Sequence, residues 1–217
     1  AAMYLGAAGV GTIGIVDADE VDLSNLQRQI IHGTADVGKA KVKSAAETMN
    51  AINPDVKVNT YRTFVTSENI MDLIADYDFI IDGTDNFPAK FLINDACVTA
   101  GVPFCHGGIE GWDGQVMTYL PKQNLPCYRC VFESLPADQE SKPIGVIGVT
   151  AGIIGTIQAS EAIRYLLGEQ DGLLKGTLLR FSGQTMQFRK IPLGKCAPHC
   201  PVCHGVPDAN PLRNHKK

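Results

Sequence analysis

The first half of the chain alternates between short apolar segments rich in β-branched residues and segments whose apolar residues recur at helical spacing. Four segments have the length and composition of strands: 12–17 (TIGIVD), 56–61, 77–82 (YDFIID) and 102–105. Three segments between them have helical spacing: 39–52, 67–75 and 86–100. This β-α alternation predicts a parallel sheet with helices on both faces.

The pattern changes after Gly107. A long helix is predicted over residues 146–167, and alternating apolar and polar residues indicate antiparallel strands on either side of it: 114–120, 177–181 and 186–191. The predicted fold class is therefore α/β, a doubly wound (Rossmann-like) and mainly parallel sheet that antiparallel strands continue.

The segment Gly9–Gly14 matches the pattern G-x-G-x-x-G of dinucleotide-binding proteins. That motif binds phosphate only where it follows a strand and opens a helix. Here a helix-like segment precedes the glycines and a strand follows them. We therefore interpret Gly9 and Gly11 as a helix C-cap and turn.

Composition excludes several classes of protein. The chain has 217 residues, of which 45% are hydrophobic and 19% charged, as in ordinary globular proteins rather than disordered ones. A formal net charge of −4 argues against a general nucleic-acid binder. The longest apolar stretch, residues 144–157, is shorter than the roughly 18 residues that span a bilayer, and the first ten residues lack the basic segment of a signal peptide. We expect neither a nucleic-acid nor a membrane partner.

Four of the seven cysteines form two C-x-x-C pairs: Cys127, Cys130, Cys200 and Cys203. An odd number of cysteines with this spacing indicates a reducing compartment, and we expect a cytoplasmic protein. Four thiolates suit a closed, tetrahedral, structural Zn²⁺ site that joins two distant segments, because a catalytic zinc keeps an open position. A redox dithiol is the main alternative, and the neighbouring Cys196, His199 and His204 leave the ligand set ambiguous.

Polar residues follow the first predicted strand directly, in the segment 17–29 (DADEVDLSNLQRQ). Ligands bind at the carboxyl ends of strands in open α/β sheets. Asp17 at the strand end can accept hydrogen bonds from ribose hydroxyls, while Asn25 and Arg28 are donors suited to phosphate oxygens. The simpler alternative is a solvated acidic loop with a serine N-cap.

Lys41 and Asp85 are candidates for the same site. Lys41 opens a predicted helix, where the helix dipole favours an acid rather than a cation, and a bound phosphate would remove this conflict. A solvated basic face is the alternative, since Lys39 and Lys43 lie beside it. Asp85 follows the strand 77–82 at the same sheet edge. It can bind Mg²⁺ through one oxygen or act as a plain N-cap.

Taken in order, these segments resemble the ThiF/MoeB/HesA family of adenylyltransferases, which are related to ubiquitin-activating enzymes. The similar motifs are D-x-D-x-V-x-x-S-N-L-x-R-Q, V-G-x-x-K, D-x-T-D-N, C-Y-R-C, a Gly- and Ile-rich helix that ends QASEAI, and a second C-x-x-C, and they cover residues 1–203. Each motif is weak alone, but the ordered set is highly specific.

The resemblance implies a homodimer that binds Mg·ATP and adenylylates the C-terminal glycine carboxylate of a ubiquitin-like sulfur-carrier protein, of the ThiS or MoaD type and ending in Gly-Gly. It implies a role in thiamine or molybdopterin biosynthesis. The implied catalytic residues are Arg28, Lys41 and Asp85. The implied nucleotide-binding residues, with Asp17 on the ribose and Asp85 on Mg²⁺, are Asp17, Asp19, Asn25, Gln27, Arg28, Lys41, Asp85 and Asn86.

The chain departs from the family pattern in two places. The family's glycine-rich phosphate loop and the strand before it should precede Ala1, so we expect residues 1–206 to be an adenylation domain without them, to bind ATP weakly and to be poorly stable. We expect residues 207–217 to be a disordered polar tail. Ser141 stands where several members carry a cysteine that bonds covalently to the carrier, which argues against a covalent step.

Three other functions fit parts of the pattern. A catalytically inactive interaction module would explain the missing phosphate loop, but it gives no reason for Asn25, Arg28, Lys41 and Asp85. A nicotinamide-dependent dehydrogenase would share the fold, but the order of the Gly9–Gly14 motif disfavours it. A tRNA-modifying dehydratase also adenylates a carboxylate, but the paired C-x-x-C motifs favour the sulfur-carrier branch.

Overall fold

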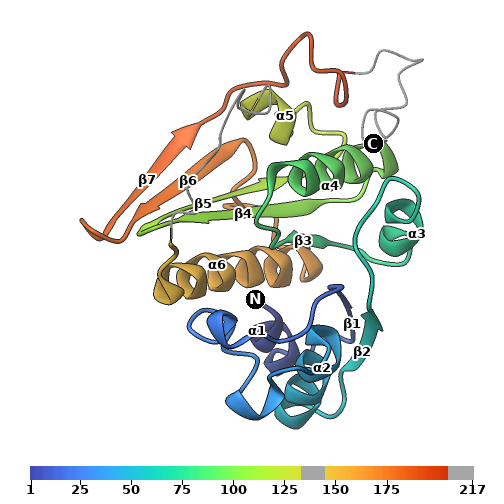
Figure 1. Ribbon diagram of the computed structural model, residues 1–217. Coiled ribbons are helices and arrows are strands. Elements are labelled where there is room, and N and C mark those ends of the chain that lie inside the picture. Colours follow the sequence, from blue (N-terminus) through green and yellow to red (C-terminus); the bar gives the residue numbers. More distant parts are fainter. Residues whose placement is uncertain (133–144, 205–217) are drawn as a thin grey trace.

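Two β-sheets with one long helix between them organise the chain (Figure 1). The computed structural model describes residues 1–132 and 145–204. The helices and short 3₁₀ turns are α1 (Ala2–Ala7), η1 (Leu23–Asn25), η2 (Thr34–Asp36), α2 (Lys41–Ile52), α3 (Ile70–Ile74), α4 (Phe87–Ala100), α5 (Tyr128–Val131) and α6 (Gly148–Leu166). The strands are β1 (Thr12–Val16), β2 (Lys57–Tyr61), β3 (Ile80–Asp82), β4 (Phe104–Glu110), β5 (Asp113–Tyr119), β6 (Thr177–Ser182) and β7 (Gln187–Pro192).

The first sheet holds β1 and β2, which pair in parallel with Thr12 opposite Lys57. A parallel pair needs a crossover, and α2 supplies it. Leu5 of α1, Ile13 of β1 and Met49 of α2 are buried in one apolar cluster, which Ala162 of α6 also joins. The N-terminal unit is thus attached to the rest of the chain through α6.

The second sheet has five strands in the order β3-β4-β5-β6-β7. β3 and β4 are parallel, and the remaining neighbours are antiparallel. The α/β class with a Rossmann-like beginning is confirmed, but parallel pairings are not the majority among the described strands. The reason is the short connection after β4: Gly111, at φ +57°, and Trp112 turn the chain straight back into β5.

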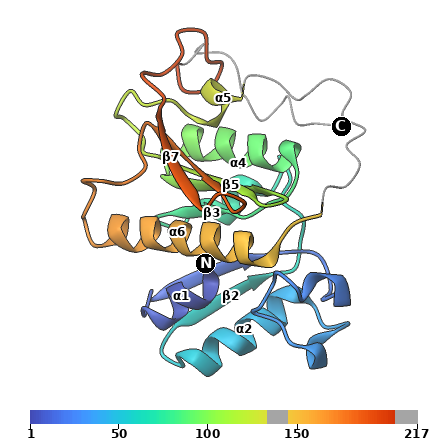
Figure 2. The same cartoon turned by 90° about the vertical axis from the view of Figure 1, so that its left-hand side faces the viewer.

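Helices cover both faces of the second sheet. α4 packs on one face, and α6 packs on the other while its far side meets α1 (Figure 2). α6 lies close to the sheet at Gly114 of β5, where an added Cβ would lie only 2.5 Å from Ile154 Cγ1. Within residues 1–132 and 145–204, no helix combines the length and apolarity that a membrane span requires.

The Gly9–Gly14 segment has the structural role that its order predicts. Gly9 has φ +78° directly after α1, and the amide of Val10 donates to the carbonyl of Leu5 in a C-capping turn. Gly14 lies inside β1 against the ring of Tyr77, where a side chain would collide with the ring. The interpretation as a helix cap and turn is confirmed for Gly9.

Candidate functional site

The loop after β1 is ordered by its own side chains. Asp22 Oδ1 accepts hydrogen bonds from the amide (2.8 Å) and the hydroxyl (2.5 Å) of Ser24, and Asn25 Oδ1 accepts from the amide of Asp22 (3.3 Å). The bonds from Ser24 hold the pKa of the Asp22 carboxyl below its usual value. The cap of this turn is therefore Asp22 rather than a serine, and the main-chain amide of Asn25 donates to the carbonyl of Asp22 (2.9 Å).

The same loop is seated against the beginning of α6. Gln27 Nε2 donates to the carbonyl of Val146 (3.3 Å), and the carbonyl of Gln27 lies so close to Gly148 that a Cβ there would overlap it. Arg28 folds back on the loop, where Nη1 donates to the carbonyl of Ser24 (3.1 Å). Asn25, Gln27 and Arg28, all predicted site residues, thus share one turn.

Three further predicted residues meet at the carboxyl end of β1. Lys41, the first residue of α2, places Nζ 3.1 Å from Asp19 Oδ2 and 3.6 Å from Asp17 Oδ2. Only 11% of the Lys41 side chain is exposed. Asp17 Oδ1 also accepts from the amide of Asp19 (2.8 Å). The two carboxylates balance the lysine charge at the helix N-terminus, which has no acidic residue in its first turn.

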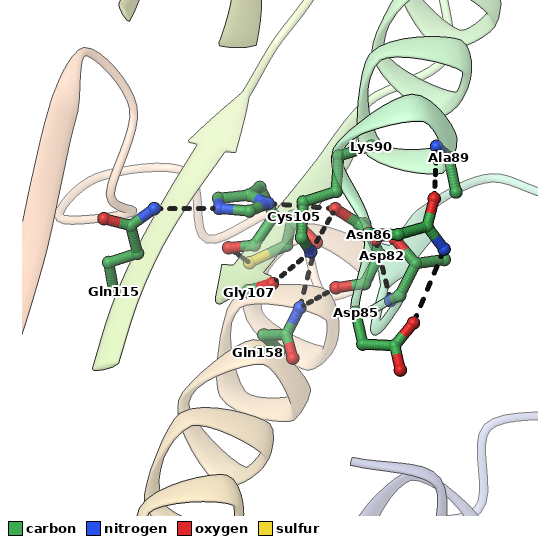
Figure 3. Close-up of polar contacts among 11 residues, drawn as sticks. Asp82, Asp85, Asn86, Ala89, Lys90, Cys105, Gly107, Gln115 and Gln158 are labelled. Atoms are coloured by element: carbon green, nitrogen blue, oxygen red, sulfur yellow. Dashed lines mark hydrogen bonds and ion pairs between the residues drawn. The ribbon is translucent and has the colours of Figure 1, made fainter. Parts of the chain in front are cut away.

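The second predicted group follows β3. Asn86 Oδ1 accepts from the amide of Ala89 (2.9 Å) and caps α4, so the cap is Asn86 and not Asp85. Asp85 is exposed, and its Oδ1 lies 3.4 Å from Asn86 Nδ2 (Figure 3). An exposed carboxylate at a sheet edge is a suitable oxygen ligand for Mg²⁺.

Beneath Asp85 lies a buried polar network that the sequence did not indicate. Asp82 Oδ2 accepts from His106 Nδ1 (2.9 Å) and from Lys90 Nζ (3.2 Å), and Asp82 is 1% exposed. Burial raises the pKa of Asp82, but the bond from His106 and the charge of Lys90 outweigh it and lower the pKa to about 2. Burial lowers the pKa of His106, which keeps the imidazole neutral. In the sequence, the one indication of this network is Lys90, a lysine among the apolar residues of α4.

The two C-x-x-C pairs converge. Sγ atoms lie 3.9 Å apart for Cys127 and Cys130, 3.6 Å for Cys127 and Cys200, and 3.4 Å for Cys130 and Cys203. Ligands of a tetrahedral metal with bonds of about 2.3 Å lie about 3.8 Å apart, so the four thiols fit such a metal. A hydrogen bond from Cys127 is the main cause that lowers the pKa of Cys200, to about 6.

Cys196 adds a fifth sulfur beside the cluster. Its Sγ lies 2.6 Å from Cys203 Sγ and 3.8 Å from His204 Nδ1. His204 contacts Cys196 and not the four clustered thiols. The candidate metal ligands are therefore cysteines. The set whose ligand atoms all lie within 4.8 Å of one another is Cys127, Cys130, Cys200 and Cys203.

The cysteine cluster is tied to α4 through α5. Arg129 lies between Cys127 and Cys130 in the sequence. Its guanidinium donates to both oxygens of Asp95, with Nε–Oδ1 at 2.6 Å and Nη2–Oδ2 at 2.7 Å. Asn94 Oδ1 accepts from the amide of Tyr128 (2.8 Å). These contacts, which the sequence did not predict, fix the cysteine segment on α4, the helix that Asn86 caps.

The structure places the predicted residues in three groups: the loop after β1 with Lys41, the loop after β3, and the cysteine cluster. Both loops follow the carboxyl end of a strand. Within the described residues, no hydrogen bond or ion pair joins the first loop to the second. Ser141 and the tail 207–217 lie outside the described residues.

Comparison with known proteins places this geometry in a family. The adenylyltransferase and sulfurtransferase MOCS3 of Dictyostelium discoideum is 40% identical over 97% of this chain, which spans 50% of that protein. The sulfur carrier protein adenylyltransferase of Thermus thermophilus is 39% identical over 98% of this chain and 80% of its own length. The SAMP-activating enzyme E1 of Haloferax volcanii is 41% identical over 94% and 75%. The chain thus spans about half the length of the MOCS3 relatives.

Solved structures support the same fold. E. coli MccB superposes with a TM-score of 0.82 over 94% of this chain and 62% of MccB, at 18% identity. PaaA superposes with a TM-score of 0.74 over 88% of this chain and 68% of PaaA, at 23% identity. The model of the ThiF family matches residues 1–202. The chain therefore belongs to the ThiF family.

Proposed function

We propose that this chain is the adenylylating part of an enzyme that uses ATP to activate the C-terminal glycine carboxylate of a ubiquitin-like sulfur-carrier protein. The observation that carries the proposal is the pairing of Lys41 with Asp17 and Asp19 at the carboxyl end of β1. The relatives from Thermus and Dictyostelium, both named adenylyltransferases, support the same chemistry.

The reaction joins a carrier carboxylate oxygen to the α-phosphorus of ATP and breaks the bond from that phosphorus to the bridging oxygen, so pyrophosphate leaves. A carboxylate is already nucleophilic at neutral pH, and no general base is required. The protein's task is to orient the phosphates and to neutralise their charge. Arg28 and the Asn25 amide supply donors from the loop, and Lys41 supplies a charge.

Lys41 would exchange one anion for another in this scheme. Its ammonium leaves Asp19, the more exposed of its two carboxylate partners, for a phosphate oxygen. Asp17 accepts hydrogen bonds from the ribose. Gln27, Asp19 and Asn86 line the two loops. Mg²⁺ held by Asp85 would supply charge neutralisation at the phosphates.

The cysteine cluster is proposed to hold one structural Zn²⁺. Four sulfurs at tetrahedral spacing leave no position for a substrate, so the metal would stabilise the fold and take no part in the reaction. It would join residues 127–130 to residues 200–203, which are distant in the sequence.

The finer assignments follow the family resemblance. We propose a homodimer, a cytoplasmic location and a carrier of the ThiS or MoaD type that ends in Gly-Gly. Sedimentation at several protein concentrations tests the dimer, whose mass would be twice the 23.3 kDa of this chain. A constant mass of one chain would exclude it.

Exchange of labelled pyrophosphate into ATP tests the reaction. We expect exchange that requires a purified ubiquitin-like carrier ending in Gly-Gly and that stops when its terminal glycine is deleted. Binding of the carrier without exchange would favour the alternative of an inactive interaction module. Exchange that ignores the carrier would contradict the proposed substrate.

A further inference from the structure

We infer that the buried network of Asp82, Lys90, His106 and Gln158 positions the Asp85 loop for its metal ion, so that these four are positioning residues for the adenylylation site. The inference rests on the proposed function, in which Asp85 binds Mg²⁺. It assigns a role to buried groups that neither touch the nucleotide loop after β1 nor belong to the cysteine cluster.

Every acceptor position of the Asp82 carboxylate is engaged. Oδ1 accepts from the Thr84 amide (2.9 Å) and the Thr84 hydroxyl (2.7 Å). Oδ2 accepts from His106 Nδ1 (2.9 Å) and Lys90 Nζ (3.2 Å). One oxygen therefore fixes the loop, while the other is anchored to β4 and α4.

The anchoring groups are themselves fixed. Lys90 Nζ also donates to the carbonyl of Gly107 (2.8 Å), and Gln115 Nε2 lies 3.4 Å from His106 Nε2. With Nδ1 donating to Asp82, the neutral imidazole has Nε2 free to accept from Gln115. From α6, Gln158 Nε2 donates to the main-chain carbonyls of Asp82 (2.8 Å) and Cys105 (3.1 Å).

The network leaves Asp85 exposed on the loop. Asp82 holds the beginning of the loop, Thr84 is bound to Asp82, and Asn86 holds the end by capping α4. Gly83 has no side chain, so Asp85 is the residue that the fixed backbone presents. Metal ligands depend on such supporting bonds, and loss of one typically weakens metal binding about 10- to 100-fold.

Stability alone does not explain the buried charges. An ion pair in a protein interior is often no more stabilising than apolar side chains of similar volume, because both charges lose their hydration. Asp82 is 1% and Lys90 7% exposed. In this inference, the Asp82–Lys90 pair instead fixes the orientation of the loop that carries Asp85.

The test is the affinity for Mn²⁺, used as a paramagnetic substitute for Mg²⁺ and followed by its electron paramagnetic resonance signal, in the presence of α,β-methylene-ATP. His106→Leu removes the donor to Asp82 Oδ2, and we expect Mn²⁺ binding about tenfold weaker or more. His106→Asn keeps an N–H donor close to the position of Nδ1 and should restore most of the affinity. Thr84→Val, a change in the loop rather than the core, should also weaken Mn²⁺ binding. If His106→Leu does not fold, Thr84→Val takes its place in the test.

Thr118→Val is the matched control. Thr118 is fully buried, and its hydroxyl donates to Glu161 Oε2 (2.6 Å) on α6, so the variant loses a buried hydrogen bond without touching the Asp85 loop. It should lower the melting temperature and leave Mn²⁺ affinity unchanged. If it weakens Mn²⁺ binding as much as His106→Leu, general destabilisation is the cause and the inference is overturned.

Asp85→Asn separates the inference from the proposed function. Wild-type Mn²⁺ affinity in Asp85→Asn would refute the metal role of Asp85 and with it the inference. Weak binding in Asp85→Asn together with wild-type binding in His106→Leu and Thr84→Val would overturn the positioning role alone.

Discussion

Lys41 is a cation whose charge is balanced by Asp17 and Asp19. With 11% of its side chain exposed, the ammonium is held where α2 begins rather than spread into solvent. A phosphate bound there would gain the lysine charge. This geometry supports the proposed role of Lys41 in binding the nucleotide.

Lys41→Ala should therefore reduce pyrophosphate exchange about a hundredfold or more, the usual effect of removing a preorganised charge at a transferring phosphoryl group. Lys43→Ala is the control, because Lys43 is an exposed residue of the same helix. Circular dichroism should show both variants folded. Equal activity of Lys41→Ala and wild type would refute the assignment.

His106 makes the stability of the protein depend on pH. Burial lowers its pKa from the usual 6.5, so the unfolded chain binds a proton that the folded chain resists. The folded protein therefore keeps its full stability above about pH 6.5, the pKa of a histidine in the unfolded chain, and loses stability as the pH falls below that value. Protonation of Asp82, whose folded pKa is about 2, adds to the loss below about pH 4.

We expect the free energy of unfolding to decrease as the pH falls from 6.5, by at most about 1.4 kcal/mol per pH unit for this one proton. In His106→Asn the slope between pH 6.5 and 5 should be smaller. Urea titrations at several pH values measure it. Thr118→Val should instead shift the whole curve downward in parallel, and a parallel shift in His106→Asn would contradict the prediction.

At the scale of single elements, α6 serves both the core and the site. Two of its glycines differ in whether a side chain would fit. A Cβ at Gly148 would overlap the carbonyl of Gln27, whereas a Cβ at Gly152 would have no other atom within 4 Å. The beginning of α6 is thus the support on which the loop with Gln27 and Arg28 rests.

Gly148→Ala should displace that loop and raise the KM for ATP in the exchange assay. Gly152→Ala, in the same helix, should leave KM unchanged and stabilise the fold by about 0.5–1 kcal/mol through higher helix propensity. Measured together, the two variants separate loop displacement from helix propensity. An unchanged KM in Gly148→Ala would mean that the loop adjusts without cost.

Local patterns predicted most elements, and tertiary contacts explain the exceptions. The strand predicted over residues 102–105 continues to Glu110, because β5 pairs along its whole length despite Gly107 and Gly108. The helix predicted from residue 67 begins at Ile70, since Thr66 and Asn69 form a turn in which Asn69 Oδ1 accepts from the Thr66 amide (2.8 Å). α5 has four residues and is stable only through its packing, so no local signal predicts it.

The candidate site shows the same division. Asp17 and Asp85 could be selected from the sequence because they follow strand ends, and Lys41 because it opens a helix. His106 and Gln158 could not, because their partners are brought to them by the packing of β4 and α6 against β3. A buried hydrogen bond between distant residues has no periodic signature.

For the whole molecule, the cysteine cluster joins two segments that are distant in the sequence. Cys127 and Cys200 are 73 residues apart in the sequence, with Sγ atoms 3.6 Å apart. A metal bound only by the folded state would add its binding free energy to stability.

Native mass spectrometry should detect one zinc per chain. Cys200→Ser should lose the metal and lower the melting temperature, and a strong chelator should do the same to the wild type. Cys97→Ala, a buried cysteine outside the cluster, should keep the metal. A metal-free protein with a Cys127–Cys130 disulfide would show that the pairs are a redox dithiol.

The division into two sheets has a consequence for how the molecule opens. Among the described strands, β1 pairs only with β2, and no backbone ladder continues from them into β3. Side-chain contacts connect the two units instead, chiefly between α1 and α6, with Phe79 and Ile81 packed against the same apolar cluster. In native-state hydrogen exchange, the amides of β1 and β2 should lose protection together, at a lower free energy than those of β4 and β5, which have a strand on each side. The nucleotide loop would thus belong to the part of the molecule that opens first, and ATP would slow its exchange.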